Sequence, residues 1–112
     1  MKIVWKYPIE VTDLQEVEMP QGSRILSVQV QKKLAVVGTG PPKSVYDPCI
    51  WALVNTEERK MIRRLFRIYG TGKPVDEPVE SLNYVGTFQQ GPFVWHVFER
   101  NVGKSHIRKV SK

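Results

Sequence analysis

The residues best suited to chemistry in this chain are two copies of Gly-Thr-Gly, each followed by a lysine. The first is Gly38-Thr39-Gly40, and the second is Gly70-Thr71-Gly72, which Lys73 follows directly. Glycine permits positive φ, so successive backbone N–H groups can converge on an anion, and the threonine hydroxyl and lysine ammonium would add to such a cradle. Neither copy has the spacing of a P-loop or of a dinucleotide fingerprint. A phosphate-binding loop and an ordinary strand-ending turn are therefore both open interpretations of Gly70–Lys73.

Arginines precede the second copy at a spacing that would place them on one face of a strand. Arg63 and Arg67 would then form a cationic stripe, and arginine binds phosphate through two parallel hydrogen bonds. The alternative is a solvated outer face on which these arginines pair with nearby carboxylates. The carboxylates available for that pairing are those of Glu57, Glu58 and Glu80.

Aromatic residues could supply a surface on which a base stacks. Six of them, on expected strands, are better explained as core: Trp5, Trp51, Trp95, Phe66, Phe88 and Phe93. Tyr69 and Tyr84 are the better candidates for stacking. The residues predicted to hold a phosphorylated ligand are Arg63, Arg67, Tyr69, Gly70, Thr71, Gly72, Lys73 and Tyr84.

The net charge is +6, from 17 Lys and Arg against 11 Asp and Glu, and such a charge can indicate nucleic-acid binding. The distribution of the charge along the chain weakens that interpretation. Five of the basic residues follow position 99 with no acidic residue among them, so residues 1–99 carry a net charge near +1. A nearly neutral body with a cationic tail differs from a domain with a basic face. The tail is interpreted either as a solubilising end or as a salt-dependent phosphate contact. The residues of this alternative nucleic-acid interface are Arg59, Lys60, Lys104, Arg108 and Lys109.

Catalytic and metal chemistry find little support. Cys49 and His96 are the one conceivable nucleophile and base, but Cys49 lies in an apolar run where a thiol is usually inert packing. Two histidines and one cysteine cannot complete a four-ligand zinc site without carboxylates, and no ligand spacing occurs. We therefore expect no enzyme activity, no catalytic residue, no bound metal and no cofactor.

The elements that must position these residues follow a period of two, which is typical of strands. Residues 26–31 alternate apolar and polar side chains most clearly, and residues 2–7 and the hairpin strand over residues 93–98 are also predicted to be strands. Seven or so short strands separated by Pro and Gly turns predict an all-β fold, a small antiparallel barrel or sandwich. Residues 31–48 break the alternation and are predicted to form a long hairpin excursion or a mobile loop, and residues 73–81 an exposed loop. Arg59–Tyr69 fits either a helix or a strand, and its β-branched and aromatic content favours a strand for Arg64–Tyr69.

The chain is 112 residues long, which fits a single β domain over residues 1–99 and a basic tail over residues 100–112. The lone cysteine suits a reducing compartment, and no apolar run approaches the roughly 18 residues of a membrane span. The N-terminus lacks the apolar core of a signal peptide. We expect a soluble protein of the cytoplasm that does not bind membranes and that forms homo-oligomers through exposed edge strands.

Several runs of sequence are similar to those of an uncharacterised family of small phage and prophage proteins. They include Lys6-Tyr7-Pro8-Ile9, Phe66–Gly72, Tyr84–Gln89 and Val94–Glu99, and they occur in order across residues 1–99. The resemblance implies phage or mobile-element ancestry and, since the family has no assigned function, brings no catalytic residues. This chain departs from the family in its longer Gln31–Pro48 excursion and in the basic tail.

These observations together predict a non-enzymatic accessory protein of phage or prophage type that acts in the host cytoplasm. As a counter-defence or host-takeover protein, it would sequester a phosphorylated small molecule, such as a nucleotide signal, or block a host protein. The alternative is an accessory protein that binds nucleic acid through its tail and the Arg59–Arg67 patch.

Overall fold

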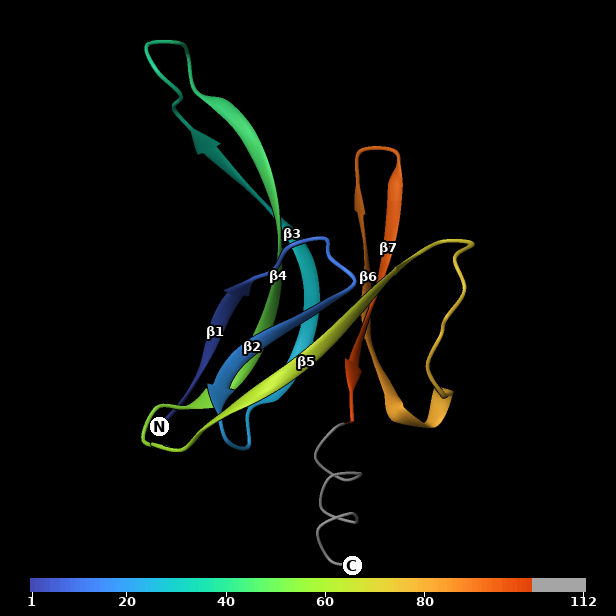
Figure 1. Ribbon diagram of the computed structural model, residues 1–112. Coiled ribbons are helices and arrows are strands. Elements are labelled where there is room, and N and C mark those ends of the chain that lie inside the picture. The colour runs from blue at the N-terminus through green and yellow to red at the C-terminus, as the bar shows by residue number, and fades with distance from the viewer. Residues whose placement is uncertain (102–112) are drawn as a thin grey trace, which may run out of the picture.

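The computed structural model of the protein describes residues 1–101, and within them it is all β (Figure 1). These residues form seven strands and one short 3₁₀ turn, η1 (Val79–Ser81), and contain no α-helix. The strands are β1 (Lys2–Pro8), β2 (Leu14–Pro20), β3 (Arg24–Ala35), β4 (Lys43–Asn55), β5 (Met61–Gly70), β6 (Leu82–Gln90) and β7 (Phe93–Arg100). Within residues 1–101 no helix is long and apolar enough to cross a membrane.

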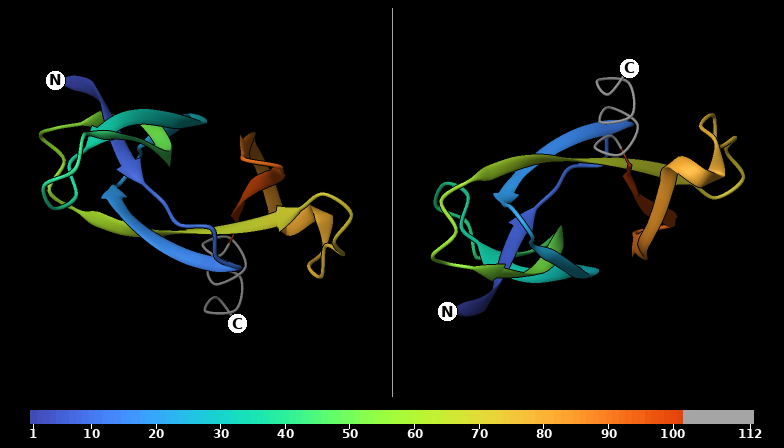
Figure 2. Two further views of the ribbon diagram at one scale, coloured as in Figure 1. Left: turned by 90° about the horizontal axis from the view of Figure 1, so that it is seen from above. Right: turned by 90° about the horizontal axis from the view of Figure 1, so that it is seen from below.

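The strands form two antiparallel sheets that lie against each other as layers (Figure 2). One sheet has the order β1-β4-β3 and the other the order β2-β5-β7-β6. The arrangement is sandwich-like and does not close into a barrel, which confirms the all-β prediction and selects the sandwich from its two alternatives. Both sheets keep open edges, because only closure removes them.

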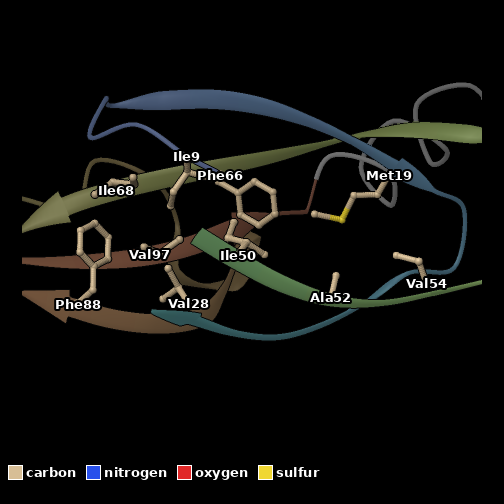
Figure 3. Packing of buried hydrophobic residues seen from close by; sticks show 10 residues of the cluster. All are labelled: Ile9, Met19, Val28, Ile50, Ala52, Val54, Phe66, Ile68, Phe88 and Val97. Atoms are coloured by element: carbon tan, nitrogen blue, oxygen red, sulfur yellow. The ribbon is translucent and has the colours of Figure 1, made fainter. Parts of the chain in front are cut away.

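The core lies between the two sheets and takes residues from both (Figure 3). β4 is the central strand of its sheet, and its residues Cys49, Ile50, Ala52 and Val54 are at most 2% exposed. Ile50, Ala52 and Val54 share the face of β4 that points into the core, whereas Trp51 and Leu53 on the opposite face are half-buried. The core cluster consists of Ile9, Met19, Val28, Ile50, Ala52, Val54, Phe66, Ile68, Phe88 and Val97.

The two ambiguous segments of the sequence are both strand-rich. β5 covers Met61–Gly70, so the strand favoured over Arg64–Tyr69 is confirmed and the helical interpretation of Arg59–Tyr69 is wrong. The excursion over residues 31–48 is a hairpin and not a loop, because β3 and β4 stay paired out to Ala35 and Lys43. Gln31–Asp47, which we call the β3–β4 arm, extends beyond the rest of the molecule (Figure 1).

The connection from β5 to β6 must pass β7, because β7 lies between those two strands in the sheet. This connection, residues 71–81, is mostly exposed, as predicted, but two of its carboxylates hold it to the sheet. Asp76 and Glu77 both form ion pairs with Arg67, and Glu77 also pairs with Arg100. Arg100, assigned from the sequence to the tail, is the last residue of β7.

Candidate functional site

The second Gly-Thr-Gly forms a tight turn at the end of β5. The Lys73 N–H donates to the Gly70 carbonyl at 3.1 Å, and Gly72 has a φ of +84°. Positive φ at the third position of such a turn favours glycine, so Gly72 is explained by the turn itself. The Thr71 N–H donates to the Val94 carbonyl at 3.3 Å, which fastens the turn to β7.

This turn stands between two hollows in the surface, of about 280 and 340 Å³. The two share Gly70, Lys73 and Trp95, so the lysine and the indole lie where they meet. The first hollow is lined by Asp13, Arg67, Ile68, Tyr69, Gly70, Lys73, Pro74, Asp76 and Trp95. The second is lined by Gly70, Thr71, Lys73, Pro92, Phe93, Val94 and Trp95. Of the eight ligand residues predicted from the sequence, five line one or both hollows.

The two hollows differ in chemistry. Two cations and two carboxylates line the first, so their charges balance, whereas the second is walled mainly by apolar side chains. In the second hollow Phe93 is 61% exposed, and its ring lies 6.0 Å from the Trp95 ring at an angle of 33°. Tilted aromatic pairs of this kind present a face on which another ring can pack.

Two side chains of the first hollow carry hydrogen-bond donors that have no acceptor. Trp95 Nε1 and Arg67 Nε are buried, and neither has a hydrogen-bond partner within residues 1–101. Both groups can only donate, and a buried donor without an acceptor costs about 1–3 kcal/mol. Neither donor is reached by the two carboxylates, Asp13 and Asp76, that line the same hollow.

Arg67 is already neutralised by the loop that crosses the sheet. Its side chain is 14% exposed, it forms ion pairs with Asp76 at 3.0 Å and with Glu77, and its guanidinium lies 5.0 Å from the Tyr69 ring centre. Burial acts to lower the pKa of Arg67, but Tyr69 and the two carboxylates outweigh it and raise that pKa. The guanidinium therefore has no free charge to offer a phosphate, which the sequence could not indicate.

Arg63 is not brought to the turn. It faces Glu18 in the β2–β5 register and forms an exposed ion pair with Glu16 at 3.7 Å. Gly70 lies seven positions further along β5, which corresponds to about 23 Å. The predicted stripe of Arg63 and Arg67 beside the turn is therefore not assembled.

Tyr69 lies too deep to stack on a ligand. It is 7% exposed, its hydroxyl donates to Asp76 Oδ1 at 3.0 Å, and its ring meets Phe98 edge to face at 5.9 Å. Burial raises the pKa of the Tyr69 hydroxyl, and the bond to Asp76 raises it further. Tyr84, at 61% exposed, remains accessible but lines neither of the two hollows at the turn.

A line of hydrogen bonds nevertheless joins Tyr84 to the turn. The Tyr84 hydroxyl lies 2.5 Å from Thr87 Oγ1, and Thr87 Oγ1 lies 3.1 Å from His96 Nδ1. His96 Nε2 is in turn 2.8 Å from Thr71 Oγ1. Because the imidazole is bonded on both nitrogens, it holds the Thr71 side chain at the rim of the second hollow.

The cysteine and histidine considered for catalysis are placed on different sheets. Cys49 lies in β4 and His96 in β7, and the two strands belong to opposite layers. Burial raises the pKa of the Cys49 thiol, which keeps it protonated and a poor nucleophile. Within residues 1–101 no three His, Cys, Asp or Glu side chains gather as a metal site.

A third hollow, of about 430 Å³, opens where β3 approaches β6 and is lined in part by Tyr84. Arg64 and Glu99 lie in its wall and form a two-bond ion pair, and Arg64 also donates to the Ser23 carbonyl at 2.8 Å. Neither the aromatic pair nor the unpartnered donors of the turn occur here. We therefore take the two hollows at Gly70–Lys73 as the candidate site.

The residues of the alternative nucleic-acid interface are not assembled within the described part of the chain. Arg59 and Lys60 lie in the connection before β5, at the end of that strand away from the turn. Lys104, Arg108 and Lys109 lie outside the described residues.

Trp95 and Phe93 are the site residues that the sequence interpretation missed, because strand-borne aromatics were assigned to the core. That assignment is wrong for Phe93, which is 61% exposed, whereas Trp95 does pack against the core cluster. The available signal was the hairpin over Gln90-Gly91, which places Phe93 at the first position of a strand and next to a turn. What no pattern provided is the pairing of Gly70 with Trp95 across β5 and β7. A glycine opposite the indole lets the ring lie close to β5, because a β-carbon on Gly70 would be only 3.2 Å from Trp95 Cζ3.

The fold defines a class of small, sandwich-like β domains with open sheet edges. Residues 1–108 match the sequence profile of a family described as a domain of unknown function, DUF7352. Because the match covers nearly the whole chain, the protein belongs to this family. No curated protein and no solved structure matches the chain.

Proposed function

We propose that this protein is a non-enzymatic accessory protein of phage or prophage type that sequesters a phosphorylated small molecule carrying an aromatic base. The observation that carries the proposal is the meeting of two hollows at Lys73 and Trp95. A base would pack against Trp95 and Phe93 in the apolar hollow, and the phosphate would lie at Lys73. Stacking on aromatic side chains is worth about 1–3 kcal/mol per base.

The charges of the site restrict the ligand further. Arg67 is compensated by Asp76 and Glu77, whereas Lys73 has no ion-pair partner within residues 1–101. One free ammonium suits a ligand with one or two negative charges and disfavours a triphosphate. A mononucleotide or a cyclic nucleotide is therefore the preferred ligand class.

In this proposal the protein binds and sequesters its ligand and does not catalyse a reaction. The candidate site contains a lysine, an indole and a hydroxyl held by an imidazole. The thiol of Cys49 is buried in β4, away from this site, and no group of metal-binding side chains occurs among residues 1–101. A ligand would leave the site unaltered. In an infected cell such capture would withdraw a nucleotide signal from the host, which agrees with the phage ancestry that the resemblance implies.

The proposal is tested by titrating the full chain with a panel of mononucleotides and cyclic nucleotides. Binding is measured by tryptophan fluorescence and by calorimetry. We expect Lys73→Ala and Trp95→Leu each to weaken binding at least about tenfold. Lys60→Ala, which removes an exposed lysine at the other end of β5, is the matched control and should leave binding unchanged. Recovered ligand should be chemically intact. Binding that is absent for every nucleotide, or that survives both substitutions, would overturn the proposal.

A further inference from the structure

The β3–β4 arm exposes more apolar surface than its position in a monomer explains. Leu34, Val36 and Val37 are 67–73% exposed, and Tyr46 is 51% exposed. The arm extends away from both sheets (Figure 1), and none of the core residues lies within it. Contiguous exposed apolar residues on a projecting hairpin mark an interaction surface.

The arm is also basic, and its outer strand is open. Lys32, Lys33 and Lys43 are exposed, and only Lys33 is compensated, by Asp47 at 2.8 Å. β3 is an edge strand of its sheet, so along the arm its outer backbone groups have no partner strand within residues 1–101. An open strand edge is a template for pairing with another chain.

A complementary strand edge exists elsewhere on the same molecule. β2 is the edge strand of the other sheet and pairs only with β5 among the described strands. No lysine or arginine occurs between Lys6 and Arg24, whereas Glu10, Asp13, Glu16 and Glu18 all fall in that stretch. Leu14 at the start of β2 is 44% exposed. Glu16 is paired with Arg63 of β5 at 3.7 Å, whereas Glu10, Asp13 and Glu18 form no ion pair within residues 1–101. β2 is thus acidic with an apolar end, where the arm is basic with an apolar tip.

We propose that the β3–β4 arm of one copy pairs with β2 of a second copy, and that the exchange is reciprocal. The two open edges supply backbone hydrogen bonds, Lys32 and Lys43 face carboxylates such as Glu18, and the apolar arm is covered. A two-fold dimer repeats each contact, so two arms and two edges are buried together. Doubling the contact brings the area toward the roughly 800 Å² per partner of a stable interface. This proposal is independent of the nucleotide site, which lies on β5 and β7.

The test reverses the charges of the arm in one variant of the full chain and those of the β2 edge in another. The oligomeric state of each variant and of their mixture is measured by native mass spectrometry and sedimentation. In the arm variant Lys32→Glu and Lys43→Glu are combined, and in the edge variant Glu16→Lys and Glu18→Lys. We expect the wild type to dimerise at tens of micromolar and each variant alone to be a monomer. An equimolar mixture should form a heterodimer, because the acidic arm meets a basic edge and the unaltered arm meets an unaltered edge. All of these associations should weaken as salt is raised.

A further variant tests the same interface without charge reversal, in case the charge-reversed chains fail to fold. Val36→Ser combined with Val37→Ser alters only exposed residues at the tip of the arm and should weaken dimerisation at least about tenfold with an unchanged circular dichroism spectrum. A monomeric wild type, a dimer that persists in either charge variant, or a mixture that stays monomeric would each overturn the proposal. A monomer that binds duplex DNA through Lys32 and Lys43 would show that the arm contacts nucleic acid instead.

Discussion

At the scale of single residues, β3 packs closely against a glycine of β6. A β-carbon placed on Gly86 of β6 would lie 2.7 Å from Val28 Cγ1, and Val28 is 4% exposed and held in the core. We expect Gly86→Ala to destabilise the protein by about 1–3 kcal/mol in urea unfolding, because neither strand can retreat freely. Gly40→Ala is the control: its nearest neighbour would be 3.7 Å away, so its effect should stay within about 0.5 kcal/mol. Equal effects of the two substitutions would contradict this account.

Two consecutive arginines of β5 provide a second comparison. Arg64 points between the sheets, where it and Glu99 are 16% and 17% exposed, whereas Arg63 is 71% exposed on the outside. Arg64→Met would leave the Glu99 carboxylate without its partner, and we expect a loss of about 3 kcal/mol in the free energy of unfolding. Arg63→Met breaks only an exposed pair with Glu16 and should cost less than about 1 kcal/mol. If chemical denaturation showed equal losses of unfolding free energy for Arg64→Met and Arg63→Met, the buried ion pair would stabilise the protein no more than the exposed one.

The same comparison shows what the sequence could provide for single residues. Alternation correctly indicated that Arg63 and Arg67 share a face, because a strand allows no other arrangement. It could not indicate that Asp76 and Glu77, about ten residues later, return to neutralise Arg67. Nor did it single out Arg64, which alternation places on the core side between Ile62 and Phe66. Long-range pairing of charges is decided by the path of a loop, which local periodicity does not encode.

At the scale of elements, residues 71–81 act as a strap across the outer face of the second sheet. Asp76 accepts hydrogen bonds from Tyr69 and Arg67, and the bond from Tyr69 is the main reason that its pKa is lowered. A carboxyl whose pKa is lower in the folded state stabilises that state above its unfolded pKa of about 3.9, and the contribution is lost as the pH falls through the folded pKa. The strap therefore adds stability at neutral pH and loses it in acid.

This linkage predicts a pH-dependent difference between the wild type and Asp76→Asn. The wild type should have the higher urea midpoint at pH 6, and the difference should shrink as the pH is lowered from about 5 toward 3. Midpoints measured every half unit of pH would show the convergence. If the urea midpoints of the wild type and of Asp76→Asn ran parallel over this pH range, the protonation of Asp76 would not contribute to the pH dependence of stability. Glu80→Gln, an exposed change in the same loop, is the control and should leave the pH dependence unaltered.

The elements themselves were largely accessible from the sequence. Period-two alternation located the strands, and glycine and proline located most of the turns, because both patterns express local backbone and burial preferences. The order β2-β5-β7-β6 was not accessible, since it depends on pairings between distant strands. The same holds for the candidate site. Local sequence predicted the turn Gly70–Lys73, but its aromatic neighbours depend on the register of β5 against β7, which local patterns do not encode.

At the scale of the whole molecule, the two proposals occupy separate parts of the fold. The nucleotide site belongs to β5, β7 and the Gly70–Lys73 turn at which the strap begins, whereas the arm belongs to β3 and β4. The core cluster lies in neither the arm nor the turn. Ligand capture and self-association should consequently be separable by deletion of the arm.

Replacing residues 32–46 by Asn-Gly makes this separation testable. Gln31 and Asp47 face each other in the β3–β4 register, and Asn-Gly is the preferred two-residue turn of a hairpin, so the shortened strands can close without strain. The deletion removes no core residue, and one hydrogen bond that joins the arm to another strand, from Gln90 to the Tyr46 carbonyl, is lost. We expect a folded monomer whose urea midpoint is close to that of the wild type and whose nucleotide affinity is unchanged. An unfolded product would show that the arm belongs to the folding unit, and a folded product that still dimerises would assign self-association to another strand edge.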